Sequence, residues 1–285
     1  MLLEGTILRG RSFQPIEGRI VVEDGRIEAI EESDARSDDI ILPAFVNAHT
    51  HVGDSIAKEA GEGLTLEELV APPDGLKHRL LAEADRSELV DAMAETLSFM
   101  EANGTAAFIE FREGGVEGIE AIEEALRGVD VESVVLGRES IEAMERSDGF
   151  GASGANDGEF SRQRNATARR SNAVTDVGLP PVSDMLDATT VALGTDNVML
   201  NSPSMFREMA FTAKLTDVST ADVLRMATIN GAEIAGLNCG LIEEGRDARL
   251  VVLDGTSPNL SGAKDPCRAV VRRAGVDDIK DVIRS

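Results

Sequence analysis

Tyrosine and tryptophan are absent from this chain of 285 residues, and only three histidines, five lysines and two cysteines occur in it. Any base stacking or aromatic cage would therefore depend on the nine Phe residues. No run of eighteen apolar residues occurs, and no basic segment precedes an apolar stretch at the N-terminus. We expect a soluble cytoplasmic protein, in which Cys239 and Cys267 stay unlinked.

Positive charge is also scarce, because 52 acidic residues stand against 28 basic ones and give a formal net charge of -24. Such a surface repels nucleic acids and anionic membranes, so we expect neither as a partner. An acidic excess spread along the whole chain is typical of halophilic proteins, whose charge repulsion is screened by a salty cytoplasm. The alternative is an acidic enzyme from an ordinary cytoplasm.

Two of the three histidines lie together, at the end of the apolar segment from Pro43 to His51. On a β-strand, residues two apart project from the same face, so His49 and His51 can reach one metal ion together. The alternative is a pair of solvated or core histidines.

A second polar cluster follows the apolar run Val191 to Leu193, where the sequence continues Gly194-Thr195-Asp196-Asn197. An Asp at the carboxyl end of a buried parallel strand occupies the place where barrel enzymes hold catalytic groups. Asp196 is therefore the candidate third metal ligand or general base. The alternative is that Asp196 only caps a turn.

Four segments in the same order resemble the amidohydrolase superfamily of metal-dependent hydrolases, in its cytosine deaminase, imidazolonepropionase and chlorohydrolase-like branches. They are residues 43–51, 194–197, 227–232 and 240–253. The resemblance implies an α/β fold, a (β/α)8 TIM-type barrel with a small β-sandwich formed by both chain ends. It also implies hydrolysis of non-peptide carbon–nitrogen bonds in a small-molecule substrate. The cofactor would be a divalent metal ion, zinc before iron, held by His49, His51 and Asp196, with Asp196 also catalytic.

The chain divides on this basis into a composite sandwich, residues 1–42 and 240–285, and a hydrolase barrel, residues 43–239. Asp24-Gly25 between two β-rich runs predicts a tight hairpin. In the barrel part, apolar periodicity predicts helices over 87–102 and 118–126 and strands over 105–111 and 131–136. Further strands are expected over 190–196, 249–253 and 268–272.

The middle of the barrel is where the sequence departs from the family. Residues 156–172 are nearly devoid of apolar side chains, and no histidine follows His78. We expect strands five and six, each of which carries a histidine in the family, to be missing through an internal deletion. The barrel would then be incomplete and its activity impaired. The alternative is a noncatalytic remnant that binds a partner or forms a homo-oligomer covering its exposed strand edges.

Four further polar residues are candidates for substrate binding. Glu110 and Arg112 stand at a predicted strand end, with a strand-end ion pair as the alternative. His78 belongs to an insert that covers the substrate or else to the surface. Asn197 follows the candidate ligand Asp196.

Overall fold

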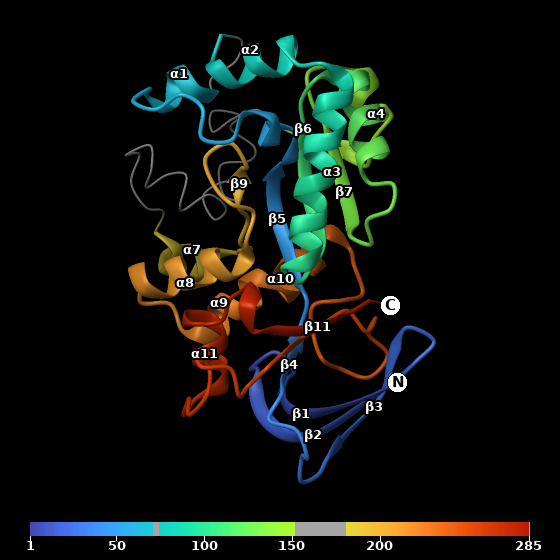
Figure 1. The fold of residues 1–285 in the computed structure, drawn as a ribbon, viewed down its shortest axis with the longest axis vertical. Coiled ribbons are helices and arrows are strands. Elements are labelled where there is room, and N and C mark those ends of the chain that lie inside the picture. The colour runs from blue at the N-terminus through green and yellow to red at the C-terminus, as the bar shows by residue number, and fades with distance from the viewer. Residues whose placement is uncertain (71–73, 152–180, 285) are drawn as a thin grey trace.

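The computed structural model describes residues 1–70, 74–151 and 181–284. Two β-sheets organise these residues, joined where β4 runs directly into β5 (Figure 1). None of the helices in these ranges is both long and apolar enough to cross a membrane.

The first sheet has six strands and contains both ends of the chain, in the order β11-β10-β4-β1-β2-β3. Its strands are β1 (Leu2–Arg9), β2 (Gln14–Glu23), β3 (Arg26–Glu32), β4 (Ile40–Pro43), β10 (Leu250–Leu253) and β11 (Ile279–Ile283). Asp24 and Gly25 join β2 to β3 with φ angles of 46° and 73°, so the predicted hairpin is confirmed.

Along its middle strands β4 and β10 both faces of this end sheet are buried, because apolar side chains alternate there. Ile7, Ile41 and Val252 belong to one apolar cluster, and their neighbours Leu8 and Leu42 belong to the other. Both chain ends therefore share one sheet, and the two-layered sandwich is not confirmed among the described residues.

The second sheet, called the central sheet below, has five parallel strands in the order β8-β7-β6-β5-β9. Its strands are β5 (Phe45–His51), β6 (Thr105–Arg112), β7 (Glu132–Gly137), β8 (Gly149–Phe150) and β9 (Asp196–Asn197). Within the described residues this sheet is open, with β8 and β9 at its edges, and no closed barrel forms. Residues 156–172, near which the family's barrel strands five and six were expected to be missing, lie outside the described residues.

Helices lie against the central sheet and beyond its strand ends (Figure 1). On the β6–β7 side are α3 (Arg86–Ala102), α4 (Gly115–Ala125) and α5 (Ile141–Glu145); past the end of β5 come the short helix η1 (Val52–Ala57), α1 (Leu66–Val70) and α2 (Leu76–Glu83). The C-terminal half contributes α7 (Val182–Ala188), α8 (Met205–Leu215), α9 (Thr220–Ala227), α10 (Ile229–Ala235), α11 (Pro266–Arg272) and η2 (Val276–Asp278).

Two predicted strands differ in the structure. Residues 268–272 are helical as part of α11, and the last strand of the chain is β11 instead. The strand expected over 190–196 is reduced to β9, which pairs only Asp196 and Asn197 with β5. The segment before β9 still runs beside β5, since the backbone N–H of Ala48 donates to the carbonyl of Leu193. The predicted helices on the β6–β7 side and strands β6 and β7 are confirmed within a few residues at each end.

Candidate metal centre

His49, His51 and Asp196 meet at the carboxyl ends of β5 and β9. The two imidazole Nε2 atoms are 3.2 Å apart, and Asp196 Oδ1 lies 3.3 Å from His49 Nε2 and 3.5 Å from His51 Nε2. One ligand atom from each of the three residues lies within 4.8 Å of the others. Because β5 and β9 are parallel neighbours, the 144 residues between His51 and Asp196 do not keep the Asp from the histidines.

The backbone before Asp196 is held close to β5 by a small residue and by an amide. A Cβ on Gly194 would lie 2.6 Å from the backbone N of His49, so a larger residue would force the strands apart. Asn47 binds Thr195 twice, through a side-chain bond of 2.8 Å to Thr195 Oγ1 and a bond of 3.0 Å from the Thr195 N–H. These contacts fix the register in which Asp196 faces the histidines.

Asp196 itself has a left-handed backbone, with φ of 58°. Non-glycine residues seldom adopt this conformation, and they concentrate at functional sites. The Asn197 amide donates to Asp196 Oδ1 at 3.0 Å and orients the carboxylate. Burial alone would raise the pKa of Asp196, but the hydrogen bond with His49 and the nearby Lys77 ammonium group hold this pKa below its usual range. The carboxyl group is therefore ionised.

His51 is oriented from its other nitrogen, as imidazoles that bind metals usually are. Its Nδ1 lies 2.9 Å from Glu113 Oε1, which leaves Nε2 facing Asp196 and His49. Burial lowers the pKa of His51 to about 4, against the opposing effect of Glu113. His51 is therefore neutral near pH 7, the form that binds a metal ion. His49 stacks on Phe111, with ring centroids 4.2 Å apart.

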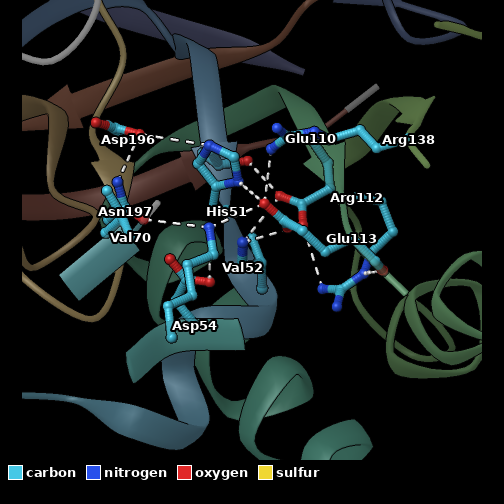
Figure 2. A network of polar contacts seen from close by, with 12 residues as sticks. His51, Val52, Asp54, Val70, Glu110, Arg112, Glu113, Arg138, Asp196 and Asn197 are labelled. Carbon is cyan, nitrogen blue, oxygen red and sulfur yellow. Dashed lines mark hydrogen bonds and ion pairs between the residues drawn. The ribbon is translucent and has the colours of Figure 1, made fainter. Parts of the chain in front are cut away.

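A buried ionic network surrounds Glu113 (Figure 2). Lys77 Nζ and Arg138 Nη1 lie 2.9 Å and 2.7 Å from Glu113 Oε1. Together with His51 they hold the pKa of Glu113 well below its usual range, although burial opposes this effect. Asp54 Oδ1 lies 3.2 Å from the same Lys77 Nζ, and burial raises the pKa of Asp54 to about 7.

Charged side chains of both signs lie around the metal group. Four buried or nearly buried carboxylates and three cationic side chains lie around the two imidazoles. The carboxylates are Asp54, Glu110, Glu113 and Asp196, and the cations are Lys77, Arg112 and Arg138. Two imidazoles and a carboxylate are a donor set that divalent metal ions accept.

The predicted substrate-binding residues lie in different places. Glu110 is fully buried; it accepts from Thr50 Oγ1 at 2.7 Å and from the Val52 N–H at 2.9 Å, and burial raises its pKa. It therefore ties the end of β5 to β6. Arg112 lies 3.5 Å from Glu110 and donates from Nε to the Glu113 carbonyl at 2.8 Å, consistent with the ion-pair alternative.

Asn197 is the member of that set that adjoins the metal group (Figure 2). His78 lies away from it, with Nε2 at 3.2 Å from the carbonyl of Val70. His78, Arg112 and Glu113 line a separate cavity of about 320 Å³ between α2, α3 and the start of α4. Glu113 thus separates this cavity from His51.

Sequence reasoning did not find Asp54, Lys77 and Glu113. Asp54 and Glu113 carried a usable signal, because each follows a strand of the central sheet within three residues and so lies at the carboxyl end of the sheet. Lys77 carried none, since a lysine in a short amphipathic helix is ordinarily solvated.

Comparison with known proteins shows which family this chain belongs to. The model of the amidohydrolase family matches residues 40–161 and 152–283. A protein of Methanothermobacter thermautotrophicus, provisionally named as an aminohydrolase, is 31% identical over 366 aligned positions that cover 94% of this chain and 93% of the relative. Since this chain has 285 residues, at least 81 of those 366 positions have no residue in it.

Solved structures agree on the fold. An adenosine deaminase from Xanthomonas campestris with bound zinc superposes with a TM-score of 0.75 at 16% identity, covering 99% of this chain and 91% of its own. The atrazine chlorohydrolase of Arthrobacter aurescens, complexed with zinc, gives a TM-score of 0.76 at 15% identity, with 99% of this chain and 93% of its own covered.

A shorter sequence match is to a 5-methylthioadenosine/S-adenosylhomocysteine deaminase of Haloarcula marismortui, which is 44% identical over 98 residues, 31% of this chain and 23% of its own. The chain belongs to the amidohydrolase family, hydrolases of carbon–nitrogen bonds other than peptide bonds.

Proposed function

We propose that this chain is a metal-dependent hydrolase of deaminase type, whose zinc ion is held by His49, His51 and Asp196. The observation that carries the proposal is that three ligand atoms, from strands far apart in sequence, lie within 4.8 Å of one another. In addition, Glu113 contacts His51 at Nδ1, the ring nitrogen that faces away from this group. Iron is the alternative metal, because imidazole and carboxylate ligands suit both ions.

The residues of the site have separable tasks in this proposal. When bound, the ion would acidify a water molecule, which would then attack the substrate carbon. Asp196, ionised and beside both imidazoles, can accept a proton at its carboxylate. Glu113 Oε1, 2.9 Å from Nδ1 of His51, would favour the proton on that nitrogen and leave Nε2 as an electron-pair donor.

We infer a ring amidine, such as an aminopurine, as the substrate class. Support comes from two relatives: the Haloarcula marismortui deaminase and a 5'-deoxyadenosine deaminase of Methanopyrus kandleri, which is 37% identical over 37% of this chain. In the same proposal, residues 43–239 form the hydrolase part, and residues 1–42 and 240–285 form its companion.

Metal content tests the proposal. Protein purified in high salt should contain about one zinc ion per chain, and His49→Ala should lose it. His78→Ala is the matched control, because His78 lies outside the metal group, and it should keep the ion. Ammonia release from 5'-deoxyadenosine and related aminopurines should then depend on His49. A zinc content unchanged by His49→Ala would contradict the proposed site.

A second candidate function is a noncatalytic member of the family. It is favoured by the 81 or more positions of the relative that have no residue here, and by the two overlapping family-model matches that meet at 152–161. We propose that this shortening removed the fifth and sixth barrel strands of the family, with their histidines. These strands are not β5 and β6 of this structure, which are present. A folded wild-type chain without bound metal would support this candidate, and metal-dependent turnover would rule it out.

A further inference from the structure

Lys77 is the one buried residue of α2, and its side chain is only 4% exposed. Its Nζ lies 2.9 Å from Glu113 Oε1 and 3.2 Å from Asp54 Oδ1, and it donates to Asn197 Oδ1 at 3.2 Å. Lysine is almost never fully buried unless it is paired. The ammonium group therefore occupies a site built from three oxygen atoms on three different segments.

Two of these oxygen-bearing residues contact proposed metal ligands directly. Glu113 lies against Nδ1 of His51, and Asn197 donates to Asp196 Oδ1. One ammonium group is thus joined through a single intermediate residue to His51 on β5 and to Asp196 on β9. Figure 2 shows Asp196 and Asn197 on one side of His51 and Glu113 on the other.

The ammonium group has to be charged to act in this way. Burial would lower the pKa of Lys77, but Asp54 and Glu113 raise it by more. A neutral side chain of the same size would leave Asp54 without its cation and Glu113 with Arg138 alone, and a buried carboxylate that loses its cation rearranges. The geometry consequently requires the charge as well as the volume of the lysine.

We propose that Lys77 is a positioning residue for the metal group, an internal cation through which α2 fixes the orientations of His51 and Asp196. The inference rests on the proposed function only in taking these residues as metal ligands. It makes the α2 segment part of the metal site, although that segment lies outside the central sheet.

Zinc affinity by chelator competition, and the visible absorption of Co²⁺-loaded protein, test this role in Lys77→Ala and Lys77→Met. Lys58→Ala is the matched control, because Lys58 is an exposed lysine shortly after η1. We expect both Lys77 variants to bind zinc at least about tenfold more weakly, the usual size of such second-sphere effects, and to change the Co²⁺ spectrum. The Lys58 variant should match the wild type.

Chemical rescue separates the charge from a general structural effect. Lys77→Ala removes the equivalent of n-propylammonium, and adding that ion should restore zinc affinity and the Co²⁺ spectrum. It should not rescue Lys77→Met, whose side chain fills the space, and 1-propanol should rescue neither. Should Lys77→Ala fail to fold, the affinity of the volume-matched Lys77→Met decides the matter alone.

Wild-type affinity in Lys77→Met, or weakened binding in Lys77→Ala that propylammonium leaves unchanged, would overturn the inference while leaving the proposed metal site intact. Absence of zinc from the wild-type chain would overturn the proposed function and this inference with it.

Discussion

Glu113 joins three side chains of the site, since His51, Lys77 and Arg138 all contact its Oε1. We expect Glu113→Gln to lower zinc affinity about 10- to 100-fold, because His51 loses its carboxylate partner. Chelator competition measures this. Glu117→Gln is the control, as Glu117 is exposed on α4. Equal affinities in the two variants would show that Glu113 does not support the ligand.

Gly194 makes a second prediction at the residue scale. Because Gly194 has no side chain, the segment before Asp196 can lie close to the backbone of His49. A Cβ added to Gly194 would lie only 2.6 Å from the His49 backbone N. Gly194→Ala should reduce the free energy of unfolding by roughly 1–3 kcal/mol, the usual cost of overpacking, and should weaken zinc binding. Urea denaturation measures the first effect. Gly275→Ala, with nothing within 4 Å of its added Cβ, should leave both unchanged.

What the sequence could predict of the site depended on strand ends. His49, His51 and Asp196 each end or follow an apolar run, and their convergence then follows from parallel strand pairing. Lys77 could not be predicted in this way, because its partners come from three other segments. The low pKa of His51 likewise depends on burial, which no local pattern reports.

Among the elements, α11 shows how a local signal misled. A short apolar run suggested a strand over 268–272, yet Asp265 accepts a bond of 2.9 Å from the Arg268 N–H and Pro266 begins the helix. This combination of an Asp N-cap and Pro at the first position is a helix start signal that outweighs a short apolar run. The hairpin at Asp24-Gly25 was predictable because its chemistry is wholly local.

The two cysteines, one shortly after α10 and one within α11, lead to a prediction of how stability depends on pH. Cys239 and Cys267 are free and buried, and burial raises the pKa of each thiol to about 11, from an ordinary value of 9.0. The folded state therefore holds these protons more tightly than the unfolded chain. This part of the stability is complete below pH 9 and is lost as pH rises from 9 to 11.

At about pH 10 the loss should be about 1 kcal/mol per thiol, as the linkage relation gives for such a shift. We expect the double variant Cys239→Ala, Cys267→Ala to lose less stability than the wild type between pH 8 and 10. The difference between the two pH profiles is the quantity to compare, because the substitutions also leave cavities. Parallel profiles from urea denaturation would contradict the raised thiol pKa values.

Across the whole molecule the acidic excess is not confined to a tail. Helix α4 presents Glu117, Glu120 and Glu123 on an exposed face, without a lysine among its residues. Such neighbours repel one another in the folded state, and repulsion of this kind destabilises a compact chain of net charge -24. The halophilic character that we propose follows from this distribution, because salt is what would relieve it.

Raising KCl from about 0.1 M to about 1 M shortens the screening length from roughly 10 Å to roughly 3 Å. We therefore expect the urea midpoint of unfolding to rise over this range. Choline chloride screens charge equally and should give the same rise, because the effect belongs to ionic strength and not to potassium. A midpoint that stays constant, or that rises with KCl alone, would mean that the acidic surface binds specific cations or is already tolerated at low salt. A rise in both salts would identify charge repulsion as the term that limits the stability of this enzyme outside a salty environment.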